Sequence, residues 1–248
     1  YYFALINLLQ AAILALLYTD DVFTAYVFIE ICTLASTGIL MIRQVGRTTV
    51  AAVRYLIFNL LGSGMFLIGI IILYDITGHL LIPNIAESVT NLVANGEYPV
   101  PLLISASLIT LGLAVKSGLF PFCYWMPDTY GYATTASSSI ISGIVSKIYI
   151  FTSIKMLYRV MGASYATQSH ITDVLFVFGL AGMIIGSLHA IREKNINRMV
   201  AFSSAAQIGY IYAAIGLGTE AGLAAAVFHM MTHALTKPLL FTAADGLI

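Results

Sequence analysis

Four ionisable residues lie inside long apolar stretches of the sequence. Glu30 lies in YVFIEICTLAS, Lys116 in LGLAVKSGLFPF, Lys147 in ISGIVSKIYIF and Lys237 in THALTKPLLF. A charge at the centre of a lipid bilayer costs about 2.5–3.5 kcal/mol, so such groups must be paired or in contact with water. Buried carboxylates and amines exchange protons readily when their surroundings change. These residue types therefore favour proton or cation transfer as the chemistry.

Three of the polar residues recur at a spacing of four: His229, His233 and Lys237. On a helix they form one stripe that advances about 40° per step. Imidazoles in a stripe can pass protons, and Thr232 and Thr236 stand beside it. A metal site is the less favoured interpretation, because no carboxylate or thiol accompanies the histidines and the HExxH pattern is absent from the sequence. We therefore expect no metal and no catalytic residue here.

The segment KSGLFPF predicts a break in a helix directly after Lys116. Gly118 tolerates unusual backbone conformations, and Pro121 lacks the amide hydrogen that the preceding turn needs. Pro238, next to Lys237, predicts a second interruption. Broken helices are tolerated at membrane depth where they are buried or line a wet cavity, and transporters place ion sites at such breaks. The alternative is that both prolines only adjust helix packing.

One hypothesis connects these residues in a single path. Burial favours a neutral amine, whereas a nearby carboxylate favours the ammonium, so a Glu30–Lys116 pair would act as an electrostatic switch. We expect Lys116 to alternate between Glu30 and a relay through Lys147 to the histidine stripe. The alternative is a set of ion pairs that only hold helices together. Buried pairs seldom give net stability, and one glutamate cannot match three lysines.

The composition indicates that the apolar stretches cross a lipid bilayer. Of 248 residues, 60% are hydrophobic and 9% are charged, whereas soluble domains have about 25% charged residues. About 20 apolar residues span the hydrocarbon core, and the short alternating segments of a β-barrel do not occur in the sequence. The sequence therefore predicts an all-α, polytopic transmembrane helix bundle with about eight spans, at residues 1–18, 22–42, 51–74, 101–125, 134–158, 172–191, 197–217 and 221–243.

The distribution of charge predicts the orientation of this bundle. Basic residues cluster in two short connections, which lie on one side because an even number of spans separates them; we expect that side to be cytoplasmic. The connection over residues 75–100 has no Lys or Arg, and its segment LLIPNIAESVTNLV fits either an interfacial helix or a loop with a helical turn. Lys and Arg equal Asp and Glu at 11 each, so no basic excess indicates a nucleic-acid partner.

Four runs resemble one known family: KSGLFPFCYWMPDTY, SGIVSKIYIF, REKNINRMVAFSSAAQIGYI and FHMMTHALTKPLLF. They are similar to the antiporter-like subunits shared by multisubunit Na⁺/H⁺ antiporters of the Mrp type, respiratory complex I and energy-converting hydrogenases. The resemblance implies two inverted five-helix repeats. Residues 1–158 would form the first, with its broken helix near 116–121. Residues 172–248 would supply three helices of the second, so the chain is interpreted as a fragment.

The resemblance also implies a function. Glu30 would partner Lys116, Lys147 would be the central relay, and His229, His233 and Lys237 would lead to a second half-channel. The expected activity is proton or Na⁺ translocation, as cation/proton antiport in an Mrp-type complex. The alternative is a proton-pumping subunit of a complex I-like NADH:quinone oxidoreductase or an energy-converting hydrogenase. The implied partners are other membrane subunits in the cytoplasmic membrane of a prokaryote.

Two other classes of function compete with translocation. The sequence has no cysteine cluster, haem ligand pair, GxGxxG or P-loop, so we expect no cofactor and assign redox chemistry to partner subunits. A passive assembly protein is the other alternative, and it predicts that the intramembrane charges are dispensable. Two positions depart from the family: it usually has a small or apolar residue in place of Pro238 and a small residue in place of Asp245. Both departures put the geometry around Lys237 in doubt.

Overall fold

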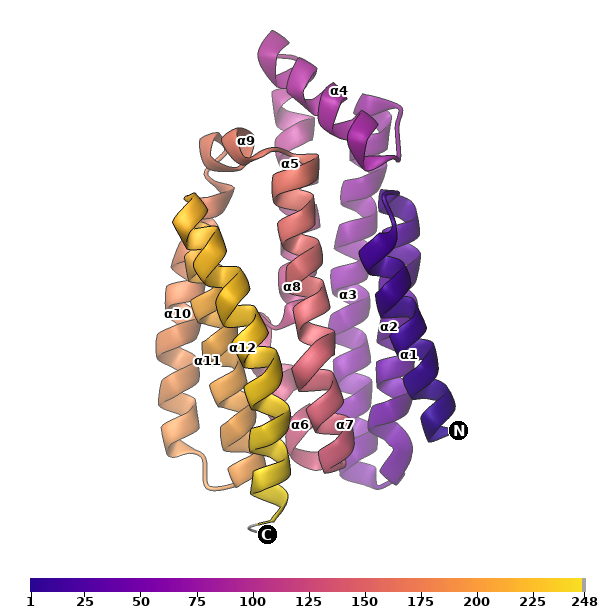
Figure 1. The fold of residues 1–248 in the computed structure, drawn as a ribbon, viewed down its shortest axis with the longest axis vertical. Coiled ribbons are helices and arrows are strands. Elements are labelled where there is room, and N and C mark those ends of the chain that lie inside the picture. The colour runs from indigo at the N-terminus through magenta and orange to yellow at the C-terminus, as the bar shows by residue number, and fades with distance from the viewer. Residues whose placement is uncertain (247–248) are drawn as a thin grey trace.

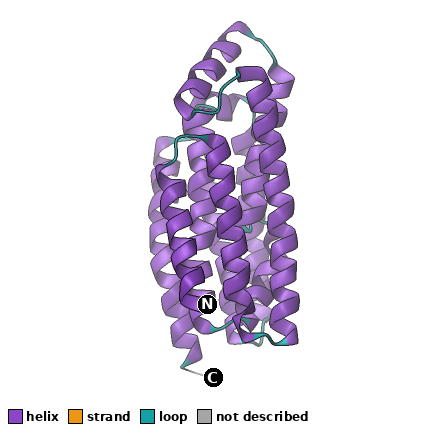
Figure 2. Cartoon of the chain, turned by 90° about the vertical axis from the view of Figure 1, so that its right-hand side faces the viewer, coloured by secondary structure: helices purple, strands orange, loops and turns teal. Residues whose placement is uncertain are grey.

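The computed structural model describes residues 1–246, and helices packed side by side make up the bundle (Figures 1 and 2). Among the described residues, β pairing is limited to one isolated antiparallel bridge between Asp21 and Leu81. The helices that run along the bundle are α1 (Tyr2–Tyr18), α2 (Val22–Leu40), α3 (Gly46–Thr77), α5 (Pro99–Ser117), α8 (Ser146–Ile154), α10 (Ile171–Arg192), α11 (Ile196–Gly216) and α12 (Glu220–Asp245).

The all-α membrane fold expected from the sequence is confirmed. Within the described residues, six helical stretches are long and apolar enough to cross a membrane: 22–43, 46–77, 99–132, 135–160, 171–192 and 196–216. The expectation of eight spans also counts α1, an apolar helix of 17 residues, and α12, a helix of 26 residues that carries the polar stripe. The count of eight therefore remains a prediction.

The stretch from 99 to 132 contains the expected break. α5 ends at Ser117, and Gly118 adopts a left-handed conformation with φ +81°. The chain then continues through the 3₁₀ segment η2 (Phe122–Trp125) into α6 (Met126–Tyr132). A Cβ added at Gly118 would lie 2.5 Å from Cε of Met126. Gly118 thus satisfies both a backbone and a space requirement at the turn.

The next span is irregular in a different way. It begins with α7 (Thr135–Ile140), passes through the π-helical segment η3 (Ile141–Val145) into α8, and ends in a second π-helical segment, η4 (Lys155–Val160). A π segment shifts the hydrogen-bond ladder by one residue and often marks a functional position. Lys147 is the second residue after the first of these segments.

Close approach of α3 and α5 places the broken helix against its neighbour. A Cβ added at Gly112 would lie 2.5 Å from the carbonyl oxygen of Gly62, and one at Gly62 would lie 3.0 Å from Cγ of Lys116. Small residues allow backbones to approach in this way in membrane helix pairs. The pair of glycines therefore positions Lys116 against α3.

The two ends of the bundle differ. At one end α4 (Ile82–Asn95) lies across the tops of the long helices, close to α9 (Ala163–Gln168) (Figure 1). The segment LLIPNIAESVTNLV is therefore a helix rather than a loop. At the other end Arg54 of α3 and Arg198 of α11 both pair with Asp128 of α6. The two basic connections consequently lie at the same end, as the sequence predicts.

Candidate functional site

The structure brings Glu30 and Lys116 together beside the helix break. Lys116 Nζ lies 3.6 Å from Glu30 Oε1, and the Lys116 side chain is fully buried. Glu30 also accepts a hydrogen bond from Ser63 of α3. Two unit charges about 4 Å apart attract each other by about 4 kcal/mol at an effective dielectric constant of 20. An attraction of this size is several times the thermal energy, so the two side chains hold each other in place.

Lys116 makes its hydrogen bond to a residue that the sequence pattern did not single out. Its Nζ donates to Thr33 Oγ1 at 2.8 Å, and the Thr33 hydroxyl lies 3.3 Å from the Tyr149 hydroxyl. The Lys116 ammonium also lies 5.2 Å from the centre of the Tyr149 ring, within the range of a cation–π contact. Thr33 is one helical turn from Glu30, so the spacing could have indicated that Thr33 lies beside Lys116. No spacing in the sequence indicates the contact with Tyr149.

The break is also tied to the second part of the chain. Ser117, next to Lys116, has its hydroxyl 2.9 Å from the hydroxyl of Tyr212 on α11, and both side chains are buried. This contact joins residues that are 95 positions apart. The end of α5 is therefore connected by hydrogen bonds to both α2 and α11.

Lys147 is buried but is bonded within its own helix. Its Nζ donates to the carbonyl oxygen of Ser142 and to Ser146 Oγ at 3.2 Å. Ser142 lies in the π-helical segment η3. The side chain thus folds back toward the start of its helix, as long helical side chains do. Its place between α8 and α12 is marked by a hollow that it lines together with Met230 and Ala234 of α12.

Lys237 faces α11 rather than the other lysines. Its Nζ donates to the carbonyl oxygen of Val200 at 3.2 Å and to Ser203 Oγ at 3.0 Å, and the side chain is 2% exposed. α12 continues through Pro238. The proline therefore removes one bond of the ladder without ending the helix, whereas the segment around Gly118 and Pro121 does end one.

The two histidines form the expected stripe. Their rings are parallel, with an interplanar angle of 1° and centroids 6.3 Å apart. Neither ring nitrogen of His233 has a protein hydrogen-bond partner among the described residues, although the side chain is 2% exposed. Thr232 and Thr236 bond to carbonyl oxygens of their own helix instead of to the imidazoles. The structure therefore brings Glu30 and Lys116 together and leaves Lys147 and the stripe in separate hydrogen-bond groups.

A second cluster of charges lies at the end of the bundle near α4. Asp20 Oδ1 lies 3.7 Å from Lys155 Nζ and 3.7 Å from Arg159 Nη1. Lys155 also donates to the carbonyl oxygen of Thr19. These two basic residues lie at the end of the bundle opposite Arg54 and Arg198, and they are balanced by Asp20 and by the carbonyl oxygen of Thr19 at the end of α1.

Helices that are long and apolar enough to cross a membrane, with a buried ion pair at a helix break, define a polytopic membrane protein. The chain belongs to the family described as NADH:quinone oxidoreductase/Mrp antiporter, TM, whose model matches residues 19–248. The resemblance seen in the four sequence runs is thereby confirmed. The family is one of multi-pass membrane proteins.

Individual relatives agree with this assignment. NADH-quinone oxidoreductase subunit N of Desulforudis audaxviator is 34% identical over 99% of this chain and 48% of that protein. A chain of the membrane-bound sulfane sulfur reductase, an archaeal respiratory membrane complex, matches with a TM-score of 0.86 and 31% identity over 96% of this chain and 48% of its own. A chain of the Mrp complex from Dietzia sp. DQ12-45-1b has a TM-score of 0.85 and 29% identity over 96% and 43%. The chain thus spans about half the length of the relatives that it matches.

Proposed function

We propose that this chain is part of a subunit that translocates protons across a membrane within a multisubunit complex. The observation that carries the proposal is the Glu30–Lys116 ion pair at the end of α5, where Gly118 turns the chain out of the helix. Backbone breaks and buried charges occur together where ions are handled in transporters. An assembly protein would have no need of a fully buried lysine at such a break.

The first step of the proposed mechanism is a change of partner at Lys116. Its ammonium is held by the Glu30 carboxylate and the Thr33 hydroxyl, one charged and one neutral. When the carboxylate takes up a proton, the attraction that holds the ammonium is lost, and burial then favours release of the lysine proton. Protonation at Glu30 and deprotonation at Lys116 are therefore coupled.

The later steps run through Lys147 to the stripe of His229, His233 and Lys237. Lys147 is bonded within its own helix, so proton transfer from Lys116 requires water between them or a new rotamer. The buried imidazole of His233 has no protein partner in the described part of the chain, and buried polar groups are nearly always hydrogen-bonded to protein or water. We therefore assign water to the segment between Lys147 and the stripe.

The repeat organisation belongs to the same proposal. Residues 1–158, from α1 into η4, correspond to the first five-helix repeat, with its broken helix at 116–121. Residues 172–248, including α10, α11 and α12, correspond to three helices of the second repeat. The proposed location is the cytoplasmic membrane of a prokaryote, with the Asp128 end facing the cytoplasm. Other membrane subunits of the complex are the proposed partners.

Two types of complex are supported. Cation/proton antiport, with Na⁺ as the second ion, follows from the likeness to the Mrp complex. A proton-pumping subunit of an NADH:quinone oxidoreductase-like complex is the second candidate, and it is favoured by the 34% identity to subunit N. Both candidates use the same buried residues. They differ in the source of energy for proton movement, which is a cation gradient in the antiporter and a redox reaction of partner subunits in the proton pump.

Everted membrane vesicles that contain the full-length protein and its partner subunits test the proposal. Dissipation of an imposed pH gradient on addition of Na⁺ would identify the antiporter. Proton uptake that depends on NADH and quinone but not on Na⁺ would identify the proton-pumping subunit. Proton movement that is unchanged when Lys116 and Lys147 are both replaced by Ala would refute translocation by this chain and favour the assembly protein.

A further inference from the structure

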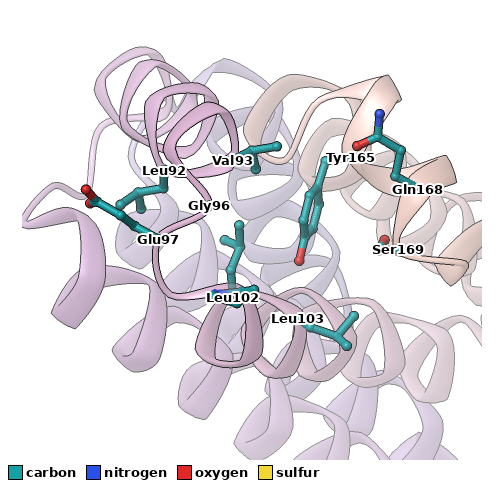
Figure 3. A pocket seen from close by; sticks show the side chains of 10 residues that line it. Leu92, Val93, Gly96, Glu97, Leu102, Leu103, Tyr165, Gln168 and Ser169 are labelled. Carbon is teal, nitrogen blue, oxygen red and sulfur yellow. The ribbon is translucent and has the colours of Figure 1, made fainter.

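Two hollows lie against the same helix on the face of α5 that is turned toward α9 and α10. The outer hollow, about 250 Å³, lies among α4, α5 and α9, and Figure 3 shows the side chains that line it. The inner hollow, about 480 Å³, lies between α5, the break at 119–122 and α10. Leu103 and Ser169 line both. The two hollows therefore form one groove that runs from the α4 end of the bundle to the helix break.

The polarity of this groove changes along its length. The inner hollow is walled mainly by apolar side chains, among them Leu111, Leu119, Phe120 and Leu175. The outer hollow has hydrogen-bonding groups: the Tyr165 hydroxyl points into it, and Gln168 lies at its edge (Figure 3). Such a gradient fits an amphipathic molecule with a long apolar tail and a polar head. The tail would extend toward the break, and the head would lie beside α9.

The groove opens to the hydrocarbon rather than to the inside of the bundle. Leu103 on α5 is 40% exposed, and Val174 and Phe178 on α10 are 52% and 37% exposed. Exposed apolar side chains on both walls indicate contact with lipid in a membrane-spanning segment. A molecule already dissolved in the bilayer can therefore enter from the side.

The charges near the groove select among amphipathic molecules. Neither hollow is lined by a lysine or arginine, within the part of the chain that the structure describes. Glu97 lies at the outer rim, with its carboxylate turned outward (Figure 3). The imidazole of His170, on the wall of the inner hollow, is held by Asp173 at 2.7 Å. Every phospholipid carries an anionic phosphate, so these acids disfavour a head group with a net negative charge and favour a zwitterionic one whose ammonium can approach Glu97.

We propose that this groove binds a phospholipid with an ammonium head group, of the phosphatidylethanolamine type. One acyl chain fills the inner hollow and contacts Phe120 and Pro121, four and five residues after Lys116. The glycerol and ester region lies beside Tyr165 and Gln168, and the ammonium lies near Glu97. The lipid thereby supports the loop that ends α5 and keeps water out of it from the bilayer side.

Photolabelling of the full-length protein in its complex tests this proposal. The complex is placed in nanodiscs with phosphatidylethanolamine that carries a diazirine on one acyl chain, and the labelled peptides are identified by mass spectrometry. We expect labels in residues 119–122 and 171–178. Leu103→Trp, which fills the junction of the two hollows, should reduce this labelling at least about tenfold. Ile104→Trp, at the neighbouring exposed position outside the groove, should leave it unchanged.

A second pair of variants covers the case in which Leu103→Trp fails to fold. Val174→Trp fills the groove from α10, and Val177→Trp is its control outside the groove. Glu97→Gln should remove the preference for phosphatidylethanolamine over phosphatidylglycerol, and Glu87→Gln on α4 should not. Equal labelling in groove and control variants would overturn the proposal. Displacement of the label by a short-chain quinone, or no label because protein covers the groove, would overturn it as well.

Discussion

The Arg198 guanidinium donates a hydrogen bond to the Asp128 carboxylate at 2.6 Å, across 70 residues of sequence. Arg54 of α3 donates to the other oxygen of the same carboxylate. Asp128 lies on α6, the short helix that follows the break after Lys116. One acid therefore holds the end of the broken span between α3, which carries the Ser63 partner of Glu30, and α11, which binds Lys237.

Replacement of Asp128 should loosen this end of the bundle. Asp128→Asn removes the charge that pairs with Arg54 and Arg198, whose side chains are 47% and 26% exposed, and this exposure reduces what each contact contributes. We expect the free energy of unfolding to fall by about 1–3 kcal/mol, read as a lower melting temperature of the purified protein. Asp173→Asn, which breaks only the exposed contact with His170, is the control and should change little.

We expect the loss of folding stability at acid pH to depend in part on Glu193. The hydrogen bond from Arg198, followed by the backbone amide of Asn195, lowers the pKa of Glu193, which lies in the connection between α10 and α11. Because the folded pKa is below the unfolded one, the stabilisation is complete above the unfolded pKa of about 4.3. It is lost as the pH falls through the folded pKa.

Glu193→Gln should therefore flatten the loss of stability below about pH 4.3, while Glu87→Gln on α4 should retain the wild-type slope. Melting temperatures measured across an acid pH series give the comparison. A Glu193→Gln profile that runs parallel to the wild type would contradict the assigned contact.

We expect Gly118 to tolerate substitution less well than Gly78, another glycine in the left-handed backbone region. Gly118→Ala places a Cβ 2.5 Å from Met126 Cε in a residue with φ +81°, whereas Gly78, with φ +69°, has nothing within 4 Å of the added atom. The left-handed conformation costs about 1–2 kcal/mol in both variants. Met126 Cε is the end of a flexible side chain, but that side chain is fully buried, so its displacement disturbs the packing around the break. We therefore expect Gly118→Ala to be less stable than Gly78→Ala in chemical unfolding.

We expect the Thr33 hydroxyl to affect both the rate and the pH dependence of transport through its hydrogen bond with Lys116. Thr33→Val removes the acceptor of the Lys116 hydrogen bond and retains the shape of the side chain. Loss of a hydrogen bond to a charged group, about 1.5–3 kcal/mol, corresponds to a decrease in transport of roughly 10- to 100-fold. The pH dependence of transport should shift as well, and Thr33→Ser should restore both. A Val variant with the wild-type rate and pH profile would remove Thr33 from the mechanism.

Several features could be predicted from the sequence because they depend on local chemistry. The break after Lys116 follows from Gly118 and Pro121, and the polar stripe follows from the spacing of His229, His233 and Lys237. The spans follow from hydrophobicity along the chain. Each of these signals is carried by residues within one helix or one turn.

The features that could not be predicted depend on how helices pack. The contacts of Thr33 with Tyr149 and of Ser117 with Tyr212 join residues about 100 positions apart. Nothing in the local pattern distinguishes these hydroxyls from other buried ones. The π-helical turn before Lys147 likewise depends on packing, and it explains why that lysine bonds to its own helix. The role of Asp128 could not be predicted, because its two arginine partners, Arg54 and Arg198, are far from it in the sequence.

Proton flux through the Lys116→Ala variant of the complete complex tests the central claim most directly. Proteoliposomes that contain wild-type and variant complexes are compared by the quenching of a pH-sensitive dye, after assembly of each complex has been confirmed. We predict that Lys116→Ala abolishes coupled proton movement, whereas Lys116→Arg, which keeps the positive charge, assembles equally well and retains the pairing with Glu30. Wild-type flux in the fully assembled Lys116→Ala complex would contradict the account.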